Sequence, residues 1–177
     1  MRKLLLATLA VALFAGLAMA QTDQTGTINI NVPVGGLFTM ALTPASGSTI
    51  TYPLMAPGTS DNTTGIVSIL VRSNFKNNTW YLKVHQNNVL TDAAITEFIP
   101  SANFTHTSAG GLGTHADAAA TQFVTGTATT FYTCDATEQK NIPAGTTITQ
   151  TMNLLVPASQ AAGTYINTLT YTLTVTP

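Results

Sequence analysis

The sequence has 177 residues, of which 7% are charged and 45% are hydrophobic, with six Lys and Arg against seven Asp and Glu. An ordinary soluble domain is about 25% charged, and phosphate recognition needs clustered Lys and Arg, so these counts exclude nucleic acid as a partner. They also argue against an intrinsically disordered chain, which combines high charge with few apolar residues.

The first 20 residues are typical of a secretory signal peptide. Two basic residues precede an apolar run over 4–17, and the small residues at 18–20 suit signal peptidase. The run is shorter than the ~20 residues of a spanning helix, so we expect cleavage before Gln21. The mature chain, residues 21–177, is then secreted to the extracellular space or cell surface, with no membrane span and no lipid anchor.

The mature chain has the composition of an all-β protein. It contains 33 threonines, and this β-branched residue favours strands over helices. Apolar and polar residues alternate, as in strands with one buried face, over 28–32, 38–42, 50–54, 80–85, 148–156 and 165–176, and two further strands are predicted over 66–72 and 129–134. These segments predict one domain over 21–177, an immunoglobulin-like β-sandwich of about 7–9 antiparallel strands.

Three segments carry more specific expectations. Residues 66–72 are apolar on both faces, which predicts a central strand. Residues 105–121 have few bulky apolar side chains and contain Ala-Gly-Gly-Leu-Gly, so we expect a long surface loop. The alternation over 165–176 is the clearest in the chain, and we expect this last strand in a sheet interior or paired with the N-terminal strand.

Sequence signals for catalysis, metal binding or a cofactor are weak. The chain has no Gly-x-Ser-x-Gly, no His-Glu-x-x-His and no glycine-rich phosphate loop, and its seven carboxylates are scattered. His106, His115 and Asp117 have no metal-ligand spacing and fall in the predicted loop, so we interpret them as solvated residues. We therefore expect no enzyme activity, no cofactor and no metal site.

Cys134 is the one cysteine of the chain. It cannot form an internal disulfide, so the fold depends on its hydrophobic core for stability. Two interpretations stay open for this thiol: a small buried hydrophobic residue, or a bridge between two chains.

Two motifs resemble the WxL domain of bacterial surface proteins. A Trp-x-Leu follows a polar turn, and the C-terminus reads Tyr-x₃-Leu-x-Tyr-x-Leu-x₃-Pro, where the family has Trp at the second aromatic position. The motif residues are Trp80, Leu82, Tyr165, Leu169, Tyr171, Leu173 and Pro177. The resemblance implies an exported protein held non-covalently on the cell wall through peptidoglycan, in complexes with other surface proteins.

The alternation suggests that these motifs are a fold signature. Trp80 shares its face with Leu82 and Val84, which are core residues of the predicted sandwich. Ligand contact then falls to the outward residues of the same strand, Tyr81, Lys83 and His85, or to the loops at the sandwich ends.

Three functional hypotheses follow. The first is a non-catalytic cell-surface protein that binds cell-wall polysaccharide, peptidoglycan or other surface proteins. The second is a structural subunit of an extracellular filament, a homopolymer in which residues 25–32 complete the sheet of a neighbouring copy. The third is a carbohydrate-binding module, which requires an exposed aromatic platform.

Overall fold

A computed structural model of the protein describes residues 29–177, and the chain divides into two compact units, 1–34 and 35–177. In the first unit, the described residues 29–34 form no strand, so the strand predicted over 28–32 is wrong for these residues. Ile30, Val32 and Val34 are exposed there. Residue 28 and the predicted signal peptide lie outside the described residues.

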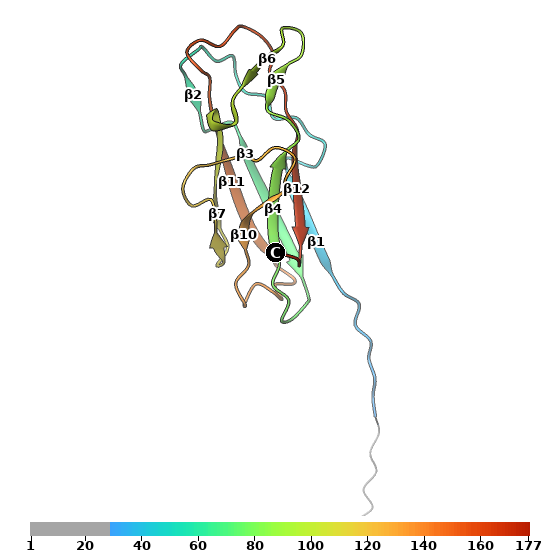
Figure 1. Cartoon of the computed structure of the whole chain (residues 1–177). Coiled ribbons are helices and arrows are strands. Elements are labelled where there is room, and N and C mark those ends of the chain that lie inside the picture. Colours follow the sequence, from blue (N-terminus) through green and yellow to red (C-terminus); the bar gives the residue numbers. More distant parts are fainter. Residues whose placement is uncertain (1–28) are drawn as a thin grey trace, which may run out of the picture. The chain divides into compact units, whose positions relative to one another are not determined.

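Residues 35–177 form two antiparallel sheets packed face to face (Figure 1). Sheet A contains, in spatial order, β1 (Phe38–Thr43), β3 (Ile66–Ser73), β11 (Thr146–Leu155), β7 (Phe104–Gly110) and β9 (Thr121–Gln122), with β2 (Ser60–Asp61) on β11. Sheet B contains β12 (Leu169–Thr174), β4 (Tyr81–Gln86), β10 (Thr129–Thr133) and β8 (Thr114–His115). A separate hairpin joins β5 (Leu90–Asp92) to β6 (Glu97–Ile99), followed by a 3₁₀ turn at Ser101–Asn103.

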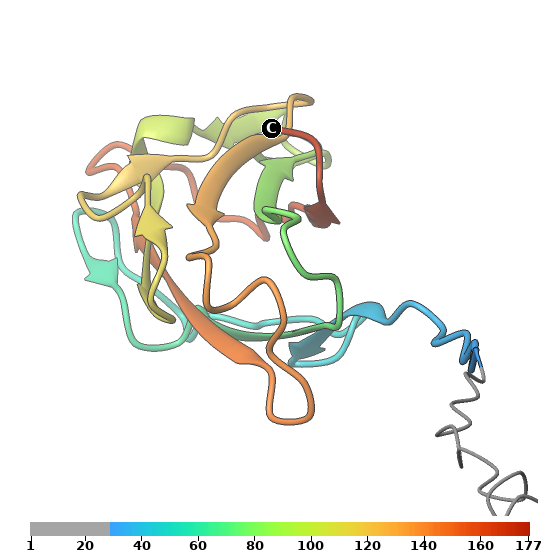
Figure 2. The same cartoon turned by 90° about the horizontal axis from the view of Figure 1, so that it is seen from below.

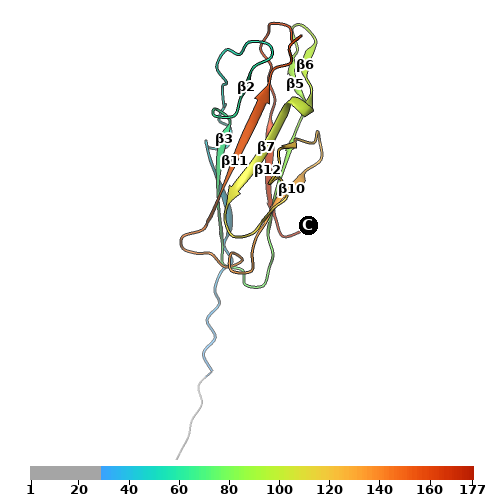
Figure 3. The ribbon, with the colours of Figure 1, turned by 90° about the vertical axis from the view of Figure 1, so that its left-hand side faces the viewer.

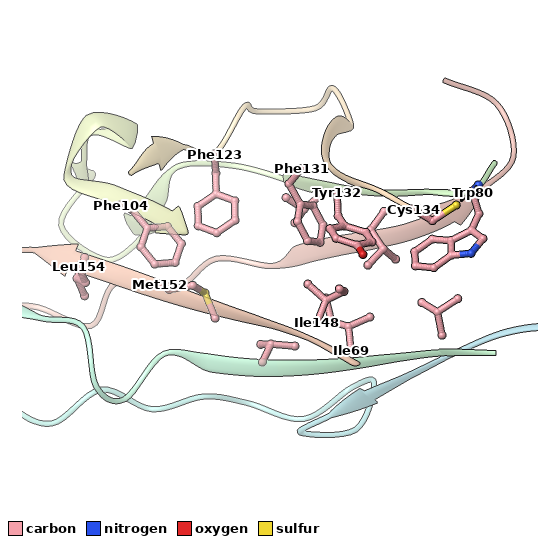
Figure 4. Packing of buried hydrophobic residues seen from close by; sticks show 14 of the residues in the cluster. Ile69, Trp80, Phe104, Phe123, Phe131, Tyr132, Cys134, Ile148, Met152 and Leu154 are labelled. Atoms are coloured by element: carbon pink, nitrogen blue, oxygen red, sulfur yellow. Dashed lines mark hydrogen bonds between the residues drawn. The ribbon is translucent and has the colours of Figure 1, made fainter. Parts of the chain in front are cut away.

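The predicted fold class is confirmed: the described chain is an all-β, immunoglobulin-like sandwich. Seven of its strands have five residues or more, and the other five have two or three. The view along the strands in Figure 2 shows the two layers, and large side chains fill the space between them (Figure 4). Among residues 29–177, no helix is long and apolar enough to cross a membrane.

Period-two alternation predicted most of the long strands. Strands β1, β4 and β11 form where apolar side chains recur at about every second position, β10 lies within the predicted strand 129–134, and β3 is central, between β1 and β11. The strand predicted over 50–54 is wrong, because no strand forms there. Ile50 and Tyr52 do pack against the core, but Leu54 is fully exposed. The alternation here therefore marks a loop that directs some of its side chains into the core and has no neighbouring strand to pair with.

Two further expectations need correction. The segment 105–121 is a surface loop only in its second half, because β7 occupies the first half and pairs along β11, as Figure 3 shows. The last strand is shorter than predicted, covering Leu169–Thr174, and it lies at the edge of sheet B, where it pairs only with β4. Although β12 forms hydrogen bonds with a strand on one side only, its inward side chains still pack against the core. This packing explains why an edge strand shows such strong alternation of apolar and polar residues.

Candidate functional site

The Trp-x-Leu motif lies in the core. Trp80 precedes β4 and is completely buried, as is Leu82. The indole ring packs against Tyr132 with 5.5 Å between ring centroids (Figure 4), and its Nε1–H donates to the carbonyl of Glu138 at 3.1 Å. A buried indole needs such a partner, so the motif's Trp ties β4 to the segment after β10.

The distal motif combines a corner with an edge strand. The hydroxyl of Tyr165 donates to the carbonyl of Ala161 at 2.8 Å, which fixes the turn that enters β12, much as tyrosine corners do in immunoglobulin-like folds. Leu169, Tyr171 and Leu173 are partly buried and pack on the core. Pro177 is exposed at the chain end.

Tyr171 takes part in a buried polar chain that crosses between the sheets. Its hydroxyl donates to Gln150 Oε1 at 2.5 Å, and Gln150 Nε2 lies 3.1 Å from His106 Nδ1. The same His106 nitrogen lies 2.7 Å from Asp117 Oδ2. Burial raises the pKa of the Tyr171 phenol, and the nearby Tyr52 raises it further, so Tyr171 remains a neutral donor.

The interpretation of His106, His115 and Asp117 as solvated loop residues is wrong. His106 and Asp117 are 2% and 1% exposed, and Ser108 connects them to the third residue. The Ser108 hydroxyl donates to Asp117 Oδ1 and lies 2.6 Å from His115 Nδ1. The inward positions of β7 are thus occupied by polar residues. A search for apolar residues at every second position could not identify this strand for that reason.

The contacts of this cluster differ from those of a nucleophilic serine site. In such a site the carboxylate orients the imidazole, and the imidazole accepts the serine proton. Here Asp117 binds the Ser108 hydroxyl directly, and the second ring nitrogen of His115 contacts the carbonyl of Gly110 at 2.7 Å. Within residues 29–177, no group of three His, Cys, Asp or Glu side chains has metal-binding geometry.

Glu138 organises a second buried cluster, which sequence reasoning did not identify. Its carboxylate accepts hydrogen bonds from the Tyr132 hydroxyl at 2.6 Å and from the backbone N–H groups of Leu112 and Asp135, both at 2.8 Å. Burial, followed by the hydrogen bond to Glu138, raises the pKa of Tyr132. These bonds connect the loops around β8 and β10 and occupy three of the roughly four acceptor positions of the Glu138 carboxylate.

Cys134 is free and buried beside Trp80. Its sulfur accepts the Trp80 backbone N–H at 3.1 Å, and burial raises the pKa of the thiol. A buried, protonated thiol is a poor nucleophile, so its contacts are those of a small core residue.

The outward residues of β4 form the centre of a polar face on sheet B. Tyr81, Lys83 and His85 are half-buried and alternate with the buried Leu82 and Val84. Cross-strand partners at directly opposite positions share a face, and here they are all threonines: Thr174, Thr172 and Thr170 on β12, and Thr133 and Thr130 on β10. We call these eight residues the threonine-flanked face.

The threonine-flanked face carries an unpaired cation. In the described part of the chain, Lys83 has no carboxylate within salt-bridge distance, since the sole pair of that kind joins His106 and Asp117. His85 Nδ1 is buried there without a hydrogen-bond partner among the described residues. The face therefore offers a positive charge, an aromatic ring and a set of hydroxyls.

A shallow hollow lies beyond the end of this face. It measures about 620 Å³ and is lined by amide and apolar side chains, among them Asn87, Asn88, Ile166 and Asn167. Asn167 already donates to Gln86 Oε1 at 3.0 Å. The lining includes no acid, base or thiol, so the hollow offers hydrogen-bonding and apolar contacts.

Comparison with known proteins leaves the chain without an assigned relative: no family model matches the sequence, and no curated protein matches it.

Proposed function

We propose that the protein is an exported, non-catalytic cell-surface protein that binds cell-wall polysaccharide or peptidoglycan through the threonine-flanked face. The observation that supports this is the row of Tyr81, Lys83 and His85 on β4, flanked on both sides by threonines. Wall polymers are extended chains with hydroxyl, amide and acidic groups, and the half-buried outward face of sheet B presents matching groups along a line. The motifs similar to WxL domains support export and wall association.

Each part of the threonine-flanked face has a role in this proposal. Lys83 supplies a compact positive charge for a carboxylate or phosphate of the polymer. The threonine hydroxyls both donate and accept hydrogen bonds, as recognition of sugar hydroxyls requires. The ring of Tyr81 offers a flat apolar surface with a polar tip. Because the face belongs to the central strand of sheet B and its neighbours, the rigid sandwich holds these groups in place.

A stand-alone carbohydrate-binding module is less well supported. That function requires an exposed aromatic platform, and the single Trp of the chain is completely buried. Polymer binding through a polar face with one Tyr gives weak contacts at each site, which suits a protein displayed in many copies on a wall.

The test is sedimentation with isolated peptidoglycan. We expect residues 21–177 to pellet with the sacculi and the double variant Tyr81→Ala with Lys83→Ala to pellet at least tenfold less. Arg72→Ala is the matched control, since Arg72 is an exposed cation on the outer face of sheet A. Failure of the wild-type chain to pellet, or equal pelleting of the double variant, contradicts the proposal.

A further inference from the structure

Residues 29–34 have the pattern of a strand without a partner. Ile30, Val32 and Val34 alternate with two asparagines and a proline, and their side chains are 82%, 71% and 81% exposed. In an extended segment this alternation puts apolar side chains on one face and polar ones on the other. Burial of the apolar face against a protein core is favourable, and strand addition to a sheet edge provides that burial.

Strand β12 offers an edge of this kind, because it pairs on one side only. The N–H of Asn87 donates to the carbonyl of Thr168 at 2.9 Å, and continuation of the β12–β4 register puts these two residues opposite each other. Bonded and non-bonded pairs alternate along an antiparallel ladder. The next residues on β12 with backbone groups directed away from β4 are therefore Leu169, Tyr171 and Leu173.

Strand β1 leaves apolar surface uncovered on the same side of the sandwich. Figures 1 and 2 show β1 and β12 along that side, and Tyr171 reaches from β12 to Gln150 on β11, two strands in from β1. Strand β12 thus lies across from the interior of sheet A. The inward side chains of β1 are only partly buried: Phe38, Met40 and Leu42.

We propose that residues 29–34 of one copy add antiparallel to the free edge of β12 in a second copy, so that the protein self-associates by strand addition. The apolar side chains of the added strand face inward, over those of β1. The backbone groups of its core-facing residues then meet those of Leu169, Tyr171 and Leu173. This inference goes beyond wall binding and does not depend on it.

Pro33 selects the antiparallel direction. Proline has no backbone N–H and is tolerated in a strand only where no ladder bond is needed. In the antiparallel arrangement Pro33 belongs to the outward-facing residues, whose backbone groups point away from β12. In a parallel arrangement with the same face inward, Pro33 would point toward β12 and one ladder bond would be missing.

The antiparallel direction also requires that the added strand come from a second copy. Strand β1 begins at the end of the sandwich where β12 ends (Figure 1), whereas Val34 of the added strand would lie opposite Leu169 at the other end of β12. The five residue steps from Leu169 to Thr174 and one layer spacing combine to about 19 Å. Within one chain, the four peptide steps from Val34 to Phe38 span at most about 14 Å.

The first test compares two charge substitutions on opposite faces of the segment. Ile30→Asp with Val32→Asp adds two charges to the apolar face, and Asn29→Asp with Asn31→Asp adds two to the polar face. By light scattering after size exclusion, we expect residues 21–177 and the asparagine variant to increase in mass with concentration. For the apolar-face variant, we expect a dissociation constant for self-association at least tenfold higher than that of the wild-type chain, with an unchanged melting temperature.

Three results overturn the proposal: a wild-type chain that stays monomeric at millimolar concentration, an apolar-face variant that associates as well as wild type, or an asparagine variant that loses association equally. The second test uses disulfide trapping between variants in which Cys134 is replaced by Ala and one new cysteine is introduced. Asn31→Cys mixed with Thr172→Cys should give a linked pair, because these positions are opposite each other in the proposed register. Asn31→Cys mixed with Thr147→Cys, on sheet A, should not. Equal trapping at both positions, or none at Thr172, also overturns the proposal.

Discussion

At the scale of single residues, Trp80 illustrates how a sequence motif can be a packing feature. The indole is completely buried and its N–H is satisfied by Glu138. Trp80→Ala removes the largest side chain between the sheets, so we expect the free energy of unfolding to decrease by about 3–5 kcal/mol. Urea denaturation measures this change.

Tyr81→Ala is the control for Trp80→Ala. Tyr81 is the neighbouring aromatic residue on the outward face of β4 and is only half-buried, so its truncation should cost clearly less stability than truncation of the completely buried Trp80. If Trp80→Ala left the urea midpoint unchanged and abolished peptidoglycan binding, Trp80 would be a ligand contact and the core interpretation of the motif would be wrong.

Tyr171 gives a second prediction at the residue scale, because its hydroxyl is the donor to Gln150 Oε1. Tyr171→Phe leaves that buried amide oxygen without its donor, and an unsatisfied buried acceptor costs about 1–3 kcal/mol. We expect a loss of this size in urea denaturation. Tyr81→Phe, on the outward face, removes a hydroxyl without a buried partner and should change nothing measurable. Equal effects in the two variants would contradict the role of the polar chain.

At the scale of elements, the strands that alternation predicted are those whose inward residues are apolar. Strand β3 directs Val67, Ile69 and Val71 into the core, and this is the pattern that period-two analysis detects. Strand β7 directs His106 inward, where its Nδ1 lies 2.7 Å from Asp117 Oδ2 and 3.1 Å from Gln150 Nε2, on two residues distant in sequence. No local pattern signals such partners, so the strand and the polar cluster could not be predicted.

The reverse error at 50–54 has a related cause. The segment has strand-like alternation, but it follows β1 at an end of sheet A where no neighbour pairs with it. Alternation reports which side chains face the core, whereas strand formation also requires a hydrogen-bonding partner. For the same reason, the sequence alone predicted that Tyr81, Lys83 and His85 face outward. It could not predict that threonines lie beside them, because that depends on which strands are neighbours of β4.

The junction between β7 and the residues after β8 gives a prediction on acid stability. Burial alone would raise the pKa of Asp117, but hydrogen bonds from His106 and Ser108 outweigh it and keep the pKa below the ordinary value. The unfolded chain therefore binds a proton more readily than the folded one. The stability that Asp117 contributes is complete above the unfolded pKa of about 3.9 and is lost as the pH falls through the folded value.

We expect the melting temperature of the wild-type chain to fall below about pH 4. Asp117→Asn should lower the melting temperature at pH 7 and reduce its further loss in acid, because the titrating carboxylate is gone. Glu97→Gln is the control, since Glu97 is an exposed carboxylate on β6, and it should leave the acid dependence unchanged. A melting temperature of Asp117→Asn that stays parallel to wild type down to pH 2 would contradict the assignment.

At the scale of the whole sandwich, two kinds of contact join the layers of residues 35–177. A continuous apolar cluster contains side chains from both sheets, including Ile69 and Ile148 from sheet A and Leu82 and Phe131 from sheet B. The polar chain through Gln150 crosses the same interface. Neither sheet can separate without exposing the shared core and breaking that chain, so the two sheets are expected to unfold together.

The single Trp of the chain makes this expectation measurable. Trp80 is buried between the layers and packs on Tyr132, so its fluorescence reports on the interface, while far-UV circular dichroism reports on the strands of both sheets. A two-state domain gives the same midpoint with both probes, and we expect coincident urea transitions. Tyr171→Phe should shift both midpoints by the same amount, because its effect is on the shared interface. A fluorescence transition that precedes the loss of strand signal would mean that the layers separate before the sheets unfold.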